Sequence, residues 1–343
     1  MPVQGEIVGI TGNLVTVEAS ERIIQNAVAY CLRADGAKLL SEVIRVRGSR
    51  ADLQVFEETR GLRVGDQVDF QEQLLSVNLG PGLLGQVFDG LQNPLHDLAA
   101  EGGFFLQAGK YLPPLSDQRT WDFQALVKSG ATVRAGDALG WVPEGIFKHL
   151  IMAPFGMQSE MQVARIAPSG SLRAGDEVAL LSSPSGQLSV SMLQRWPVKV
   201  PLNISSRRLL PREPLVTGIR IIDSLFPVVR GGTYCIPGPF GAGKTVLQQL
   251  TSRYAQVDVV IVAACGERAG EVVETLREFP ELIDPRTGRS LMERTIIICN
   301  TSAMPVAARE ASIYTAATLG EYYRQMGLDV LLLADSTSRW AQA

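Results

Sequence analysis

Apolar and polar residues alternate in short runs over the first 72 residues of the chain. A period of two is typical of β-strands that bury one face, and glycine-bearing turns separate the runs. Short strands joined in this way favour a closed antiparallel barrel. The runs that carry the pattern are Gly5–Ile10, Leu14–Glu18, Ser41–Val46 and Asp52–Phe56.

After Trp196 the apolar runs become continuous and alternate with helical patterns. Strands that are buried on both faces lack polar alternation, so this part of the chain predicts a parallel α/β sheet with a helix after each of its first three strands. Ligands of such sheets bind at the carboxyl ends of the strands. The predicted strands are Thr233–Ile236, Asp258–Ala264, Thr295–Cys299 and Asp329–Ala334.

These patterns divide the chain into four segments. We expect an N-terminal β-barrel over residues 1–72 and a linker over 73–104, which contains the sequence LGPGLLG and joins the nucleotide-binding domain. A second β-rich domain, with many prolines and glycines, is expected over 105–195. The α/β nucleotide-binding domain is expected over 196–343.

The form apolar-Arg-x-Gly-Asp-x-apolar occurs three times, at Leu62–Val68, Val133–Leu139 and Leu172–Val178. Gly-Asp between β-forming residues is typical of turns. We interpret the three copies as β-hairpin turns. The alternative is a repeated binding site built on the three arginines.

Composition narrows the classes of function. The 343 residues carry a net charge of −3, which gives no basic footprint for nucleic acid. No apolar run is long enough to span a bilayer and the start has no signal-peptide pattern, so we expect an intracellular protein. The two histidines, His96 and His149, are expected at the surface or in packing. The cysteines are expected to be buried reduced thiols, at positions Cys31, Cys235, Cys265 and Cys299.

The most informative motif is GPFGAGKT, from Gly238 to Thr245. Glycines let the backbone turn tightly so that its N–H groups face phosphate oxygens. Lys244 supplies positive charge at the outer phosphates, and Thr245 supplies a hydroxyl for Mg²⁺. The apolar run before the loop predicts a strand, and Val246, Leu247, Leu250 and Tyr254 fall on one face of a following helix. The predicted nucleotide contacts are Gly238, Pro239, Phe240, Gly241, Ala242, Gly243, Lys244, Thr245 and Val246.

Two further strand ends carry acids. Asp335 closes an apolar strand, where phosphate-binding-loop enzymes hold Mg²⁺ directly or through water. Glu267 closes the strand after the loop's helix and is followed by Arg268, so it is a candidate to orient the attacking water. The alternative for Glu267 is a solvated residue at a helix N-terminus, where glutamate is common. Ser336–Arg339 follow Asp335 and are candidates to line the same site.

Together with several longer segments, these motifs resemble the catalytic A subunit of V/A-type rotary ATPases. The resemblance rests on GPFGAGKT, on CGER with its downstream EFPEL, and on NTSAMPVAAREASIY and LLLADSTSRWAQA. LGPGLLGQVFDGLQNPL and QRWPV are similar as well, and the β-rich domain resembles the insertion that distinguishes these A subunits from F-type β subunits. The resemblance implies a multidomain fold: an N-terminal β-barrel, an inserted β-rich bulge domain and a RecA-like P-loop α/β domain.

The resemblance also assigns roles. It makes Lys244 the phosphate lysine, Thr245 and Asp335 the residues at Mg²⁺, Glu267 the water-activating carboxylate and Arg268 its phosphate-side neighbour. It implies ATP or ADP and Mg²⁺ as ligands and a ring that alternates with a B subunit. Central and peripheral stalk subunits would complete the complex, and contact with the membrane would run only through the ion-translocating sector. An arginine from the B subunit would act in trans.

The chain departs from the family pattern in three places. Ala269-Gly270 stands where Gly-Asn is usual, and Ala303 stands where Asn is usual. The family also continues beyond SRWA, so we expect this chain to be truncated at its C-terminus. An export ATPase of the flagellar or secretion type and a non-catalytic nucleotide-binding relic are the alternatives.

Overall fold

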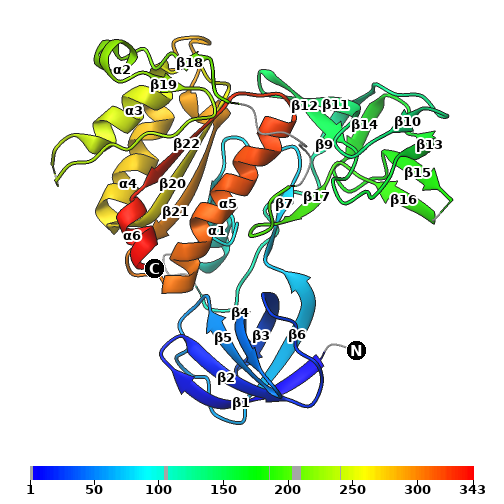
Figure 1. Ribbon diagram of the computed structural model, residues 1–343, viewed down its shortest axis with the longest axis vertical. Coiled ribbons are helices and arrows are strands. Elements are labelled where there is room, and N and C mark those ends of the chain that lie inside the picture. Colours follow the sequence, from blue (N-terminus) through cyan, green and yellow to red (C-terminus); the bar gives the residue numbers. More distant parts are fainter. Residues whose placement is uncertain (1–2, 104–106, 185, 203–209, 240) are drawn as a thin grey trace.

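Three bodies make up the molecule: a β-barrel, a β-rich extension and an α/β layer (Figure 1). The computed structural model describes residues 3–103, 107–184, 186–202, 210–239 and 241–343. The barrel lies at the bottom of Figure 1, the α/β layer above it and the extension to one side. This arrangement confirms the predicted fold class.

The barrel closes because its first and last strands pair. Strand β1 joins β6 antiparallel, with Val3 opposite Phe70, and the strand order is β1-β2-β5-β4-β3-β6. Alternate residues point inward, as the period of two predicts, and Ile7, Val15 and Leu53 are fully buried. The strands are β1 (Val3–Thr11), β2 (Leu14–Ala19), β3 (Ala27–Leu32), β4 (Lys38–Arg47), β5 (Arg50–Val55) and β6 (Gln67–Leu74).

The segment expected as a linker contributes to two sheets. Strand β7 (Ser76–Leu79) pairs with β17 (Gln194–Pro197), and the short strand β8 (Val87–Phe88) joins the α/β sheet in parallel with β21. Helix α1 (Leu95–Gly102) follows. The connection between barrel and extension is therefore part of the α/β layer.

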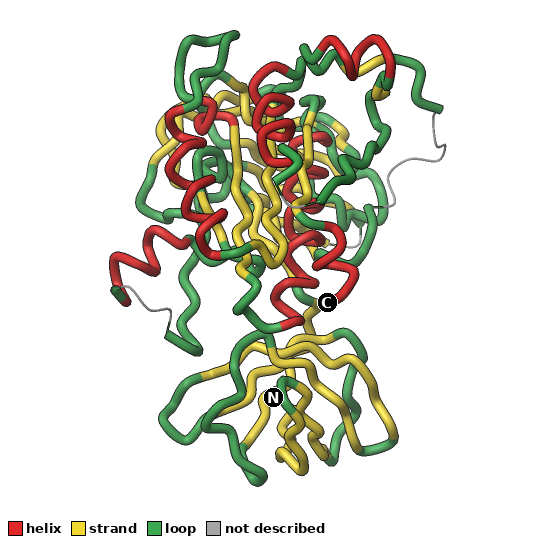
Figure 2. Tube along the Cα trace, turned by 90° about the vertical axis from the view of Figure 1, so that its left-hand side faces the viewer, coloured by secondary structure: helices red, strands yellow, loops and turns green. Residues whose placement is uncertain are grey.

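The extension is built from two four-stranded sheets that enclose their own apolar core. One has the order β10-β13-β15-β16 and the other β12-β11-β9-β14. Figure 1 shows these strands to one side of the α/β layer, and Figure 2 shows the barrel, which is built of strands and loops, below the helices of that layer. They are β9 (Thr120–Ala125), β10 (Thr132–Val133), β11 (Ala138–Glu144), β12 (Phe147–Met152), β13 (Met161–Ile166), β14 (Gly170–Arg173), β15 (Ala179–Ser183) and β16 (Gly186–Val190).

The three Arg-x-Gly-Asp segments are turns, as predicted, and all three share one hydrogen-bond pattern. In each, the aspartate carboxylate accepts from the arginine N–H at 2.7 Å and the aspartate N–H donates to the arginine carbonyl at 3.1 Å. They are not hairpins, which corrects the prediction. The strands on either side of the second and third turns pair with other partners, so each turn passes the chain from one sheet to another.

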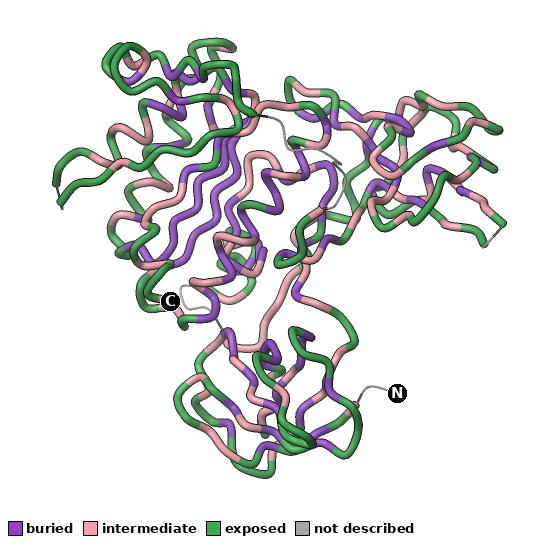
Figure 3. Tube along the Cα trace, viewed as in Figure 1, coloured by how far each residue is buried: buried purple, intermediate pink, exposed green. Residues whose placement is uncertain are grey.

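The α/β sheet has the order β22-β20-β21-β8 and every pair is parallel. Figure 3 shows its central strands buried. Alternate residues of β20 face opposite layers: Val259 and Ile261 pack with helix α5, whereas Val260 and Val262 pack with the side that carries α3 and α4. The principal elements are α3 (Lys244–Tyr254), β20 (Val259–Glu267), α4 (Ala269–Glu278), β21 (Thr295–Thr301), α5 (Val306–Gln325), β22 (Val330–Asp335) and α6 (Thr337–Gln342).

Smaller elements complete the layer at its margins. They are the two-stranded pair β18 (Pro214–Leu215) and β19 (Val228–Val229), helix α2 (Arg220–Leu225), and the 3₁₀ turns Phe279–Glu281 and Leu291–Arg294. No helix among the described residues is both long enough and apolar enough to cross a bilayer.

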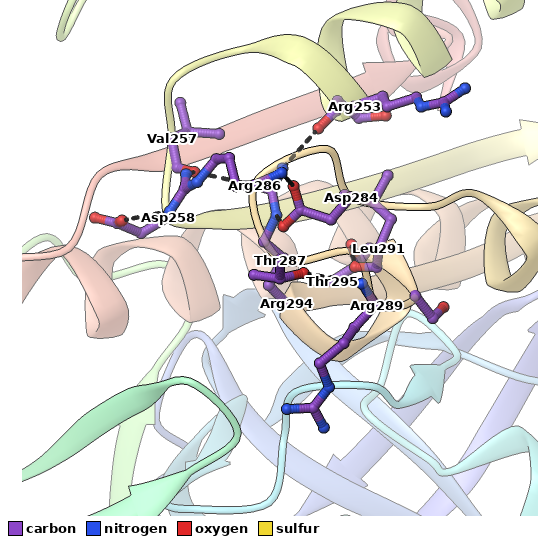
Figure 4. Close-up of polar contacts among 12 residues, drawn as sticks. Arg253, Val257, Asp258, Asp284, Arg286, Thr287, Arg289, Leu291, Arg294 and Thr295 are labelled. Atoms are coloured by element: carbon purple, nitrogen blue, oxygen red, sulfur yellow. Dashed lines mark hydrogen bonds and ion pairs between the residues drawn. The ribbon is translucent and has the colours of Figure 1, made fainter.

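The amino end of the sheet is held by a buried ion pair (Figure 4). Arg294 Nε lies 2.9 Å from Asp284 Oδ2, and both side chains are almost fully buried. The other guanidinium nitrogens donate to the carbonyls of Val257 and Ser252 at 3.1 and 3.3 Å. At the start of β21, the Thr295 hydroxyl donates to the Leu291 carbonyl at 2.8 Å.

The predicted strand Thr233–Ile236 is wrong, because these residues form no strand and Tyr234 and Cys235 are exposed. A strand needs a neighbour for its N–H and C=O groups, and the described sheet ends at β22 without pairing to this run. The helix after the loop is present as α3. Its predicted apolar face is covered only in part: Leu247 packs against the core, whereas Val246, Leu250 and Tyr254 remain exposed.

The other cysteines and both histidines lie as the sequence predicts. Cys31, Cys265 and Cys299 are buried free thiols, and only Cys235 contradicts the expectation. His96 is exposed. His149 is buried in packing, where it bonds Glu144 through Nδ1 at 2.6 Å and the Tyr322 hydroxyl through Nε2 at 2.9 Å. It thereby joins the extension to α5.

Candidate nucleotide-binding site

The loop GPFGAGKT leads directly into helix α3. Gly241 and Gly243 have φ of 77° and 84°, a left-handed conformation that favours glycine. Gly243 is the N-cap residue and Lys244 the first residue of the helix, so the positive end of α3 faces the loop. Of the nine predicted contact residues, Phe240 lies outside the described residues.

The Lys244 ammonium turns back over the loop. Its Nζ donates to the carbonyl oxygens of Gly238 and Pro239 at 2.9 and 3.0 Å. A lysine ammonium has three donors, so these two contacts leave one for a further acceptor. Thr245, the next residue of the helix, is exposed.

Asp335 ends strand β22 beside the loop and its helix. The pKa of its carboxyl is raised mainly by burial, while a hydrogen bond from Gln248 and the charge of Lys244 act in the opposite direction. Gln248 and Lys244 both belong to α3. The loop lysine, its helix and the strand-end acid therefore meet at one edge of the sheet, as the sequence predicts.

Glu267 ends strand β20 at the same edge. In the parallel register Ala264 lies opposite Asp335, so Glu267 stands three residues further along its strand. The Glu267 side chain is largely buried, and Arg339 Nη1 of helix α6 lies 3.1 Å from its Oε2. Arg339 also donates to the Gly266 carbonyl, which fixes the guanidinium against the strand end.

The pKa of Glu267 is raised to about 7. Burial is the main cause, followed by a hydrogen bond with Glu271 and by the charge of Asp335, while Arg339 opposes the shift. The pKa of Glu271 is shifted in the opposite direction, and the same hydrogen bond with Glu267 is the main cause of its lowering. A carboxyl group with a pKa near neutrality is suited to accept a proton from water.

Arg268 is the N-cap residue of α4, immediately after Glu267. Its charge and its backbone N–H both act on the carboxylate of Glu271, one turn into the helix. Arg268 thus belongs to the same charged cluster.

The residues present suit a nucleotide-bound Mg²⁺ better than a metal held by protein alone. The described residues contain no group of three or more His, Cys, Asp or Glu side chains arranged to bind a metal. Mg²⁺ in nucleotide sites usually takes one or two carboxylates, waters and the substrate's phosphates. Asp335, placed within the electrostatic reach of Lys244, and the exposed Thr245 hydroxyl fit that type of donor set.

Sequence reasoning missed two members of this cluster. Glu271 was not singled out, although GER-x-x-E places it one helical turn after Arg268. Gln248 follows Lys244 at the i+4 spacing and faces Asp335. Arg339 was expected only to line the site, whereas it forms an ion pair with Glu267.

Comparison with known proteins identifies the family. Three family models match in sequence order: the ATP synthase alpha/beta family beta-barrel domain over residues 7–71, the alpha/beta subunit barrel-sandwich domain over 112–199, and the family's nucleotide-binding domain over 218–343. The chain belongs to the ATP synthase alpha/beta family.

Within this family the chain is similar to V-type ATP synthase alpha chains. It is 59% identical to that of Borrelia turicatae over 344 aligned residues, which cover 100% of this chain and 60% of the relative. The alpha chains of Borrelia hermsii and Borreliella burgdorferi are 59% and 58% identical, and 59% and 60% of their lengths are covered. The chain thus spans about 60% of the length of the curated relatives it matches. The resemblance to V/A-type A subunits is confirmed.

Solved structures share the fold. The assembled ATPase EscN of the enteropathogenic E. coli type III secretion system matches with a TM-score of 0.58 and 21% identity, over 98% of this chain and 58% of that one. EscN in complex with its central stalk EscO matches equally well. At this identity the likeness concerns the fold alone.

Proposed function

We propose that this chain forms the catalytic nucleotide site of a V/A-type rotary ATPase, which hydrolyses or synthesises ATP coupled to proton or sodium transport. One observation carries the proposal: Lys244, Glu267 and Asp335 come from three separate segments and meet at the carboxyl edge of one parallel sheet. A phosphate-binding loop, a carboxyl group with a raised pKa and a strand-end acid are the parts that phosphoryl transfer to water requires.

Each residue has a distinct task in this proposal. The loop Gly238–Val246 and the positive end of α3 bind the phosphates, and Lys244 donates to the outer ones. Thr245 and Asp335 hold Mg²⁺, which neutralises phosphate charge when bound. Glu267 orients the attacking water and accepts its proton. Arg268 keeps Glu271 in place and supplies positive charge on the phosphate side.

The proposed partners follow from the family. The chain would alternate with B subunits in a ring, would contact central and peripheral stalk subunits, and would lie peripheral to the membrane on its cytoplasmic side. Phosphoryl transfer needs positive charge at the γ-phosphate, and an arginine supplied in trans is worth about 10³–10⁵ in turnover. We therefore expect the isolated chain to release phosphate near the background rate, and robust activity of the monomer would contradict the partner requirement.

Nucleotide binding is the direct test. Lys244→Ala removes the lysine that the loop directs at the phosphates, so we expect most affinity for Mg-ATP to be lost in isothermal titration calorimetry. Lys148→Ala is the matched control, because this lysine lies in the extension over the ring of Trp141. Unchanged affinity of the Lys244 variant, measured in the assembled complex, would refute the loop assignment.

A further inference from the structure

Asn300 is a buried polar residue that the proposed chemistry does not use. It lies near the end of β21, directly opposite Cys265 of β20. Cys265 comes two residues before Glu267 on that strand. Its side chain is almost inaccessible to solvent, with 1% of the residue exposed. Buried amides persist where their hydrogen bonds are made, and those of Asn300 reach two other segments.

The first segment is the turn after β8. The Gly90 N–H donates to Asn300 Oδ1 at 3.2 Å, and the Gly90 carbonyl accepts from the Thr315 hydroxyl of α5 at 2.7 Å. A Cβ at position 90 would lie 2.3 Å from Asn300 Nδ2 and 2.6 Å from the Ala308 carbonyl oxygen. Only glycine fits this close approach, so the turn is pressed against the amide.

The second segment is the first turn of α5. Asn300 Nδ2 donates to the Ala308 carbonyl at 2.6 Å. This bond fixes the backbone position of Ala308 and therefore that of the next residue, Arg309. The Arg309 carbonyl accepts from the Cys265 thiol at 3.2 Å, and Arg309 Cδ lies 3.1 Å from the position that a Cβ of Gly266 would occupy.

These contacts lead to Glu267. Gly266 has φ of 74°, and Arg339 also packs against it, with its nearest side-chain atom 3.4 Å from the same Cβ position. Arg339 in turn pairs with Glu267. Two arginines therefore pack against the backbone that carries the Glu267 carboxyl group, and one of them, Arg309, belongs to the helix turn that Asn300 holds.

We infer that Asn300 is a positioning residue for Glu267: by tying the start of α5 to the end of β21, it fixes the strand end from which Glu267 meets the attacking water. This inference rests on the proposed function. The competing explanation is that Asn300 only stabilises the fold, as any buried hydrogen-bonded amide does.

Steady-state kinetics of the assembled complex separate the two explanations. Asn300→Ala should lower kcat by about 10- to 100-fold with KM nearly unchanged, because small misplacements of a catalytic group cost up to about 10²-fold. The apparent pKa of the acidic limb of the pH–rate profile should change, since this limb reports the pKa of the essential base. Thr295→Val is the matched control: it removes a buried hydrogen bond from the other end of the same strand. It should lower the melting temperature and leave kcat and the pH profile unchanged.

Asn300→Asp is a second variant, in case the alanine variant does not fold. It keeps the shape and the acceptor for Gly90 but removes the donor to Ala308, so kcat should fall at neutral pH. Equal losses of kcat in the Asn300 and Thr295 variants would overturn the inference, and so would wild-type kcat in Asn300→Asp. Glu267→Gln is measured alongside: if that variant keeps its turnover, the proposed function itself fails, whichever way Asn300 behaves.

Discussion

The two ends of one parallel sheet use charge in opposite ways. At the amino end, Arg294 and Asp284 are buried together, and the guanidinium is satisfied by the carboxylate and two carbonyls. At the carboxyl end, Glu267, Glu271 and Asp335 lie close enough to act on one another, and Arg339 forms an ion pair with Glu267. One cation and one anion are paired at the amino end, whereas three carboxyl groups act on one another at the carboxyl end, beside Lys244, Arg268 and Arg339.

The difference shows what each end is suited to do. A fully paired buried ion is costly to disturb, because removing one partner leaves the other charge buried without compensation. Burial, followed by the hydrogen bond with Glu271 and the charge of Asp335, raises the pKa of Glu267 to about 7, where the group can exchange protons. The first arrangement supports folding and the second supports chemistry. Substitutions at the carboxyl end should therefore lower turnover, whereas substitutions at the amino end should lower the free energy of unfolding.

Glu267→Gln should give the largest effect and only on chemistry. The amide keeps the size and shape of the side chain but cannot accept the proton, so turnover in the assembled complex should fall by about 10²–10⁴. Nucleotide affinity and melting temperature should stay close to wild type. Turnover near normal would show that the carboxyl end is structural as well, and the contrast between the two ends would then disappear.

Arg294→Met should act on folding and not on chemistry. It leaves Asp284 buried without its cation, which costs about 3–5 kcal/mol of the free energy of unfolding. Urea denaturation followed by circular dichroism measures the loss. The double variant Arg294→Met/Asp284→Asn removes both charges and should recover part of it. If the single variant were as stable as wild type, the pair at the amino end would have no stabilising role.

The pH dependence of stability should separate the two glutamates at the carboxyl end. The pKa of Glu267 is raised from its usual 4.5 to about 7, so the folded state holds this proton more tightly. Its contribution to stability is complete below pH 4.5 and is lost as pH rises through 7. The pKa of Glu271 is lowered, so its contribution is present above its usual value and is lost as pH falls below it.

The free energy of unfolding, measured by denaturation of the chain at pH 5, 6, 7 and 8, tests the predicted contribution of Glu267. The group contributes at most about 1.4 kcal/mol per pH unit, and Glu267→Gln should remove that decline. A wild-type profile that matches the variant's over this range would mean that Glu267 titrates near its usual pKa.

Thr295→Val should give the smallest effect. It removes the hydroxyl that donates to the Leu291 carbonyl in the buried amino end, at a cost of about 1 kcal/mol in the free energy of unfolding. Turnover should not change. A drop in turnover comparable to that of Asn300→Ala would show that losing a buried hydrogen bond at either end of β21 lowers turnover, and the contrast between the two ends would then fail.

Local patterns in the sequence were sufficient for much of this architecture. The alternation in the barrel, the turns built on Gly-Asp and the continuous apolar strands Val259–Glu267 and Val330–Asp335 are signals that lie within a few residues. The phosphate-binding loop is equally local, because its glycines, Lys244 and Thr245 are consecutive or nearly so. Glu267 and Asp335 could be proposed because the carboxyl ends of parallel strands share one edge.

Contacts between distant segments could not be predicted in this way. Thr233–Ile236 has the composition of a strand, but pairing depends on a neighbour that composition does not reveal. Two residues of the charged cluster, Arg339 and Glu271, act on Glu267 from two different helices. The proposed roles of the site residues stay predictions until the substitutions above are measured.

The place of β8 bears on how the protein is synthesised. Gly90 and Asn300 are bonded although they lie 210 residues apart in sequence. A ribosome that adds about 5–20 residues per second needs on the order of 10–40 seconds between them. Through that interval the barrel and the extension can each complete their own cores, while Val87–Phe88 waits for the strand beside which it will lie. A gene segment that encodes residues 218–343 alone would omit this strand and Gly90, so expression of the α/β layer requires both stretches of the chain.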